Sequence, residues 1–108
     1  LNAKSDLTTT NLTTVYTVPS ATTAVIKSIL VSDDSGSGTT IDVTLVDASS
    51  NIFSLFKAKA VGANTTVELL TQPLILQESE ALKVQAADAN ELHVVASILE
   101  VKPREVVT

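Results

Sequence analysis

The sequence contains no cysteine and few aromatic residues, and both features narrow what the protein can do. Without cysteine there are no disulfides, no thiol nucleophile and no cysteine-ligated zinc. Tyr16, Phe53 and Phe56 are the only aromatic residues, so the core has to be built from valine, isoleucine, leucine and alanine. Stability must therefore come from aliphatic packing or from association with other chains.

Positive charge is also scarce. The chain has 7 lysines and arginines against 12 acidic residues, which gives a formal net charge of -5. A protein without a basic patch cannot neutralise many phosphates, so we expect no nucleic-acid partner. The longest apolar runs fall far short of the ~20 residues that a membrane helix needs. The first residues, LNAKSDL, lack the apolar segment of a secretory signal peptide, so we expect none here.

Threonine and valine are abundant instead, with 15 and 14 residues. Both are β-branched and pack well on a pleated sheet, so the composition is typical of strands. Alternation of apolar and polar residues is clear in several segments, whereas helical spacing is hard to find. At 108 residues, the chain suits a single domain.

The alternation and the turn residues predict eight strands. We place these strands at residues 13–18, 23–32, 39–48, 52–61, 65–70, 74–77, 80–87 and 91–101. Short strands at this spacing predict an all-β fold, a single antiparallel β-sandwich with jelly-roll or Ig-like Greek-key topology. Residues 1–12 are polar and are expected to form an N-terminal arm, 13–101 the sandwich domain and 102–108 a C-terminal tail.

Some of the predicted strands carry apolar side chains on both faces. The residues are Val25, Ile29 and Val31 opposite Ile26 and Leu30 in the strand 23–32, and Leu92, Val94, Ala96 and Ile98 opposite Val95 and Leu99 in the strand 91–101. A strand that is half exposed in a small sandwich should be polar on its outer face. Two interpretations remain open, namely scattered exposed aliphatics or an interface with a subunit or partner.

The most polar stretch is SDDSGSGTT, Ser32 to Thr40, which invites comparison with ion-binding and phosphate-binding loops. Counted from Asp33, Gly38 matches the sixth position of an EF-hand loop, but the twelfth is Thr44 instead of the required glutamate. A phosphate-binding P-loop needs a lysine that is absent here. Aspartate, serine and glycine instead favour a hairpin loop between two strands, with a weak ion site as the alternative.

Other polar residues are weak candidates for catalysis. His93, the only histidine, lies in a predicted strand without a nucleophile motif, so we expect a solvent-facing, interface or pH-sensitive residue. Glu78 and Glu80 flank a bend and are expected to be solvated, not paired for glycoside hydrolysis. Lys57 and Lys59 indicate a strand edge protected against aggregation, or a charge contact with a partner. We expect no enzyme activity and no catalytic, cofactor-binding or metal-binding residues.

Three segments resemble a known group of proteins. They are LTTVYTVPSATTAVIKSILVSD from Leu12 to Asp33, ANTTVEL from Ala63 to Leu69, and LHVVASILEV from Leu92 to Val101. Together they resemble the small β-sandwich virion proteins of tailed bacteriophages over about residues 12–101. Related modules occur in head decoration proteins, in neck and tail attachments and in fibre domains.

The resemblance implies a structural protein without enzyme activity. The role it favours is a capsid decoration (cement) protein that binds and stabilises the shell of the major capsid protein. Such a protein would be made in the host cytoplasm, would reside on the capsid surface of the virion and would form a homo-oligomer, with a trimer favoured. The arm 1–12 and the tail 102–108 would become ordered on binding. The alternatives are a neck, tail or tail-fibre module, or a receptor-binding or carbohydrate-binding domain.

Overall fold

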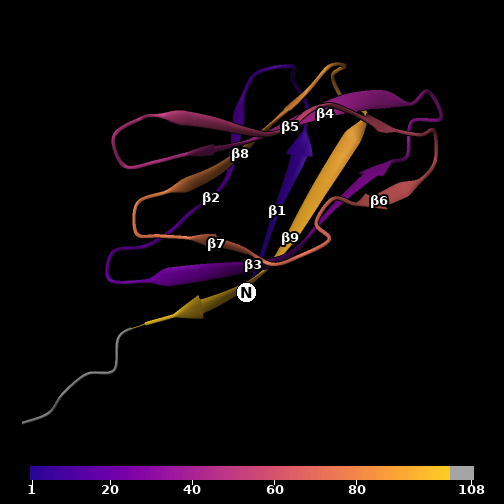
Figure 1. Ribbon diagram of the computed structural model, residues 1–108. Coiled ribbons are helices and arrows are strands. Elements are labelled where there is room, and N and C mark those ends of the chain that lie inside the picture. The colour runs from indigo at the N-terminus through magenta and orange to yellow at the C-terminus, as the bar shows by residue number, and fades with distance from the viewer. Residues whose placement is uncertain (103–108) are drawn as a thin grey trace, which may run out of the picture.

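A computed structural model describes residues 1–102, which form nine strands arranged as a sandwich (Figure 1). The strands are β1 Asn2–Leu7, β2 Thr13–Thr17, β3 Thr23–Asp33, β4 Thr39–Val46, β5 Ile52–Val61, β6 Thr66–Glu68, β7 Leu74–Leu76, β8 Ala81–Ala86 and β9 Leu92–Val101. The predicted all-β sandwich is confirmed. Within the described residues there is no helix long and apolar enough to cross a membrane.

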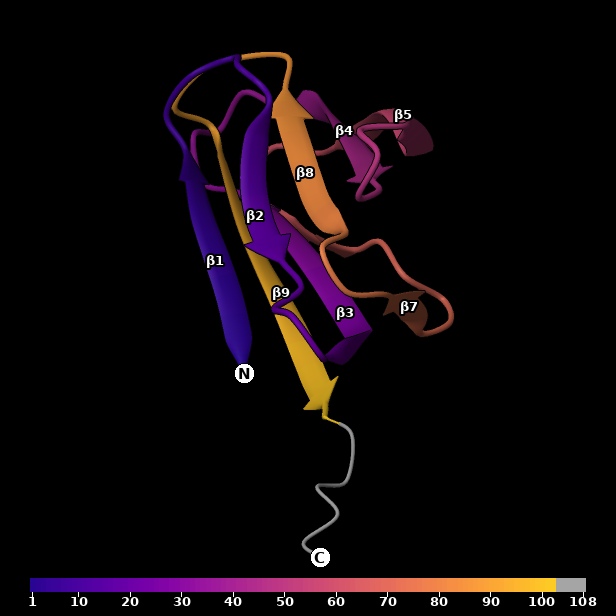
Figure 2. The same cartoon turned by 90° about the vertical axis from the view of Figure 1, so that its left-hand side faces the viewer.

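The strands form two antiparallel sheets, visible as two layers in Figure 2. Sheet A has the order β1-β9-β3-β6, with β7 also paired to β3, and sheet B has the order β2-β8-β4-β5. The chain pairs as a long hairpin folded back on itself, because β4 pairs with β5, β3 with β6 and β7, β2 with β8, and β1 with β9. This pairing places strands from opposite ends of the chain side by side in each sheet.

All eight predicted strands are present, and β5 has the predicted bounds. The ninth strand, β1, corrects the prediction of a loose N-terminal arm. It pairs with β9 from Asn2 opposite Ser97 to Leu7 opposite Leu92, and Leu7 is only 1% exposed. Residues 1–7 are therefore part of the sandwich, and of the predicted tail only Lys102 lies within the described residues.

The core between the sheets is aliphatic, as the composition predicts. The largest fully buried side chains are Leu7, Val18, Ile26, Ile29, Val31, Ile41, Val43, Val61, Leu76, Leu82, Val84 and Leu92. Tyr16 on β2 lies at the edge of this core and donates a 2.6 Å hydrogen bond to Oε2 of Glu100 on β9, which joins the two sheets. Burial, together with the bond and the negative charge of Glu100, raises the pKa of Tyr16 well above its usual value.

A β-bulge in β3 changes which residues face the core. Ile26 pairs with Ile98 and Ser28 pairs with Ser97, so Lys27 is an extra residue without a partner on β9. The bulge shifts the alternation by one residue, and Ile26 and Ile29 are both fully buried. The sequence analysis wrongly placed them on opposite faces, because strict alternation leaves no room for an inserted residue.

Candidate interaction surface

Aliphatic side chains gather on the outer side of sheet A, away from the core. Val25 on β3 pairs with Ile75 on β7 and with Leu99 on β9, so the three form one row across the sheet. Ile75 is 61% exposed and Leu99 is 48% exposed. Val101, Leu30 and Val95 extend the group along the same side of β9 and β3. We refer to Val25, Leu30, Ile75, Val95, Leu99 and Val101 as the apolar face.

The bulge at Lys27 produces the apolar face on β3. Val25 points outward before the bulge and Leu30 points outward after it, although strict alternation puts them on opposite sides. Sequence analysis therefore missed that these two residues share a surface, and it did not single out Ile75 or Val101. The pair of Ser28 and Ser97 separates Leu30 and Val95 from the other members of the apolar face. An outer sheet face in water is normally polar, so aliphatic side chains on both sides of this pair indicate a contact surface.

The side chain of Glu68 forms a hydrogen bond with the backbone of β3 next to the bulge. β7 pairs with residues Ala24 to Ile26 and β6 pairs with Leu30 to Ser32, so neither strand covers the bulge between them. The backbone N–H of Ile29 donates instead to Oε2 of Glu68 at 3.0 Å. Since this amide would otherwise lack a strand partner, Glu68 stabilises the bulge that shapes the apolar face.

The loop from Ser32 to Thr40 connects the two sheets, because β3 lies in sheet A and β4 in sheet B. The prediction of a hairpin is therefore wrong, since a hairpin joins neighbouring strands of one sheet. Asp33 organises the loop from a position that is 2% exposed. Its Oδ1 accepts hydrogen bonds from the N–H of Ser35 at 2.8 Å and from the Ser35 hydroxyl at 2.7 Å.

These donors also determine the ionisation of Asp33. The Ser35 hydroxyl, followed by the amides of Ser35, Gly38 and Gly36, lowers the pKa of Asp33 below its usual value against the opposing effect of burial. Gly36 and Gly38 have φ angles of 83° and 69°, as a tight turn requires. Residues 1–102 contain no group of three or more histidine, cysteine, aspartate or glutamate side chains that could hold a metal ion. Oδ1 of Asp33 therefore shapes the connection, whereas its Oδ2 is buried without a hydrogen-bond partner in the described part of the chain.

His93 lies on the outer side of β9 between two carboxylates. Its Nδ1 is 3.4 Å from Oδ1 of Asp6 on β1, and its Nε2 is 3.4 Å from Oδ2 of Asp34 in the loop after β3. The imidazole is 43% exposed. The arrangement joins β1, β9 and the loop that crosses between the sheets, and when protonated His93 forms an ion pair with each carboxylate.

Glu78 and Glu80, which the sequence analysis considered as a carboxylate pair, lie at the bend before β8. Glu80 accepts a 2.7 Å hydrogen bond from the N–H of Gln77 through its Oε1, and Glu78 is exposed. The backbone N–H of Glu80 also donates to the carbonyl of Gln77 at 3.0 Å. One carboxylate therefore closes the bend before β8 while the other faces water.

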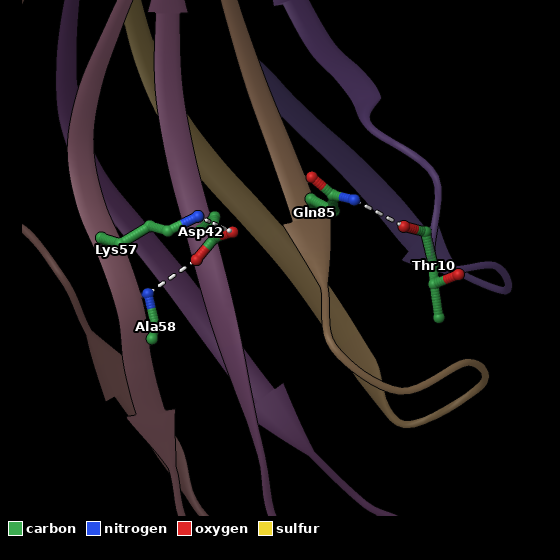
Figure 3. A network of polar contacts seen from close by, with 5 residues as sticks. All are labelled: Thr10, Asp42, Lys57, Ala58 and Gln85. Atoms are coloured by element: carbon green, nitrogen blue, oxygen red, sulfur yellow. Dashed lines mark hydrogen bonds and ion pairs between the residues drawn. The ribbon is translucent and has the colours of Figure 1, made fainter.

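Lys57 and Lys59 are exposed on β5, the edge strand of sheet B, in agreement with a protected strand edge. Lys57 Nζ lies 3.4 Å from Oδ2 of Asp42 on β4 (Figure 3). The same strand exposes Ile52 by 65% and Phe53 by 52%. β5 therefore combines charged and apolar groups on one accessible edge.

Neither a protein family nor a curated protein matches the sequence.

Proposed function

We propose that this chain is a structural protein of a tailed-phage virion, a capsid decoration protein that stabilises the shell of the major capsid protein. The observation that supports the proposal most is the apolar face. A sandwich with an aliphatic core has no structural need for a second aliphatic surface, and such a surface lowers solubility unless a partner covers it. The phage resemblance of residues 12–101 supplies the class of partner.

The apolar face suits a permanent contact. Fully burying one large aliphatic side chain contributes about 1.5–3 kcal/mol, and a half-exposed one contributes about half of that. Ile75, Leu99 and Val101 are each about half exposed or more. They lie on a sheet whose bulge is fastened by Glu68, so little conformational freedom is lost when they bind.

A homotrimer is the assembly that we propose. Closed cyclic oligomers are the common form of soluble assemblies, and a three-fold ring fits the three-fold and quasi-three-fold points of an icosahedral shell. The location that follows is the capsid surface, reached after synthesis in the host cytoplasm. The second candidate, a neck or tail component, uses the same apolar face at a site of lower copy number.

The copy number in purified virions tests the proposal. Quantitative mass spectrometry of the source phage should find on the order of hundreds of chains per particle if the protein covers the capsid. About a dozen or fewer would favour the neck or tail instead. Complete absence from the virion would refute both candidates.

A further inference from the structure

A shallow hollow lies on the outer side of sheet B, the opposite side of the sandwich from the apolar face. Its volume is about 350 Å³. It is lined by Leu12 from the connection between β1 and β2, by Asp42 and Thr44 from β4, by Ile52, Ser54 and Lys57 from β5, and by Gln85 from β8. Three neighbouring strands and one loop therefore contribute to it.

The register of sheet B places the polar groups of the hollow side by side. Asp42 pairs with Gln85, and Thr44 pairs with Ser54. Paired residues of neighbouring strands project on the same side of a sheet, and Ile41 and Val43 on either side of Asp42 are fully buried. The carboxylate of Asp42, the amide of Gln85 and the hydroxyl of Ser54 consequently project outward from a rigid sheet.

The carboxylate of Asp42 and the amide of Gln85 are each held in position by a hydrogen bond to the backbone (Figure 3). Oδ1 of Asp42 accepts a 2.6 Å hydrogen bond from the N–H of Ala58, and Oδ2 lies 3.4 Å from Nζ of Lys57. Nε2 of Gln85 donates to the carbonyl of Thr10 at 2.9 Å, which fixes the amide and leaves Oε1 as an acceptor. A site whose polar groups are already oriented loses less entropy when it binds a ligand.

Unused hydrogen-bonding capacity remains around the hollow. Among residues 1–102, no protein group bonds to Oε1 of Gln85 or to the hydroxyl of Ser54. The ammonium of Lys57 keeps further N–H donors, and the carboxylate of Asp42 keeps further lone pairs. Leu12 and Ile52, which are 43% and 65% exposed, supply apolar surface beside these groups. The hollow therefore offers donors, acceptors and aliphatic contact together.

We propose that this hollow binds a neutral, polyhydroxylated ligand, a sugar unit of a glycan. The positive charge of Lys57 offsets the negative charge of Asp42, so the pair favours neither an anion nor a cation. Hydroxyl groups both donate and accept, which matches the carboxylate, the amide oxygen and the ammonium. The C–H faces of a sugar ring match Leu12 and Ile52. Because the hollow faces away from the apolar face, it stays accessible when that face is covered.

Chemical-shift titration of the full chain tests the site directly. We would add neutral oligosaccharides built from glucose, galactose, mannose or N-acetylglucosamine, up to about 20 mM, to the isotopically labelled protein. At least one sugar should shift the backbone amides of Asp42, Ser54, Lys57 and Gln85 in a saturable way, with a dissociation constant of about 1 mM. No shift with any of these sugars, or shifts confined to other surfaces, would overturn the proposal.

Three variants identify the groups that bind. Ser54→Ala and Gln85→Leu each remove one hydrogen-bonding group and should weaken the dissociation constant about 3- to 10-fold. Ser97→Ala is the matched control, because it removes the hydroxyl of an exposed residue on the outer side of sheet A, so affinity should stay within about 2-fold. Equal affinity of Ser54→Ala, Gln85→Leu and the unaltered protein would overturn the proposal. The titration measures ligand binding by the isolated protein, whereas the copy number measures how many chains a virion contains. Either measurement can therefore fail without the other.

Discussion

The two outer faces of the sandwich differ in character although both sheets cover the same aliphatic core. The outer side of sheet A presents Ile75, Leu99 and Val101 to solvent. The outer side of sheet B presents Gln85 from β8, Asp42 from β4 and Ser54 from β5. The core needs only the inner side of each sheet, so the outer residues are available for contacts. This difference is the reason that we propose an apolar contact on sheet A and a hydrogen-bonded ligand on sheet B.

Both faces depend on a bulge in a strand. In sheet A the extra residue is Lys27, and the bulge brings aliphatic residues to one side of β3. In sheet B the pairing of β4 with β5 shifts between Ile41 and Val43, and Ala58 in this region has a φ of 52°. The carboxylate of Asp42 accepts the N–H of Ala58. The same kind of irregularity thus shapes an aliphatic surface in one sheet and a polar hollow in the other.

Inserting one alanine between Ile29 and Leu30 should have the largest effect, because β3 would then carry a second extra residue besides Lys27. Leu30 to Asp33 would turn to the opposite face, so the fully buried Val31 would become exposed. We expect loss of cooperative thermal unfolding by circular dichroism. Lys27→Ala keeps the residue count and should change the free energy of unfolding by no more than about 0.5 kcal/mol. An insertion variant that melts like the unaltered protein would show that the register of β3 does not decide which of its residues are buried.

Leu7→Ala should have the next largest effect, since it tests whether β1 belongs to sheet A. Leu7 is 1% exposed, and truncating a buried leucine costs about 2–5 kcal/mol. Leu12→Ala, at the hollow of sheet B, is the comparison because Leu12 is 43% exposed, and its cost should be about 0.5 kcal/mol. Urea denaturation measures both values. Similar stability of the two variants would show that β1 is not part of the core.

Replacing Ile75 and Leu99 together by aspartate should abolish association while leaving the fold intact. Both side chains point away from the core, so the melting temperature should change little. Binding to shells that lack the protein should weaken about 100-fold or more, since central apolar contacts dominate interfaces. Co-sedimentation with such shells measures the effect. Ser54→Asp, on the outer side of sheet B, is the control and should bind normally. Retained binding by the double variant would exclude the apolar face as the contact.

The smallest expected effect is that of low pH on the free energy of unfolding. It compares an aspartate in the loop after β3 of sheet A with one in the hairpin between β4 and β5 of sheet B. Asp33 organises the former, and Asp47 accepts the N–H groups of Ser49 and Asn51 at 2.9 Å in the latter. Hydrogen-bond donors lower the pKa of both carboxyls below the usual 3.8. The main cause is the Ser35 hydroxyl for Asp33 and the backbone N–H of Asn51 for Asp47. Each carboxylate therefore stabilises the fold above pH 3.8, and this contribution is lost as the pH falls through the folded-state pKa.

Asparagine variants make this effect measurable. Asp33→Asn and Asp47→Asn should be less stable than the unaltered protein at pH 7, and the difference should shrink at pH values below 3.8. Urea denaturation at the two pH values gives the free energies of unfolding. A difference that stays constant between neutral and acidic pH would show that ionisation of these carboxyls does not matter.

The sequence predicts most of the strands because their periodicity is local. Alternation in Thr39 to Val46 and in Leu92 to Val101 is read from neighbouring residues alone, and both strands lie close to the predicted positions. β1 was missed because NAKSDL contains only Ala3 and Leu7 as apolar residues. An edge strand that contributes one large side chain to the core leaves too weak a pattern to distinguish it from a polar arm.

The surfaces could not be predicted because they depend on contacts between distant residues. Val25 and Leu30 share a face only through the bulge that β3 forms against β9. Asp42 and Gln85 become neighbours only through the pairing of β4 with β8. Residue types can be read along a chain, but register across a sheet is set by packing and turns far away in the sequence.

The doubled-back path of the chain has a kinetic consequence. β9 lies between β1 and β3 in sheet A, yet it follows all the other strands along the chain. Asn2 meets Ser97 only when both are present, and closing so long a segment costs entropy before any contact compensates for it. Until β9 emerges during synthesis, β1 and β3 remain unjoined edges that can pair with other chains. Folding should therefore be slow, and it should be completed only after the last strand leaves the ribosome.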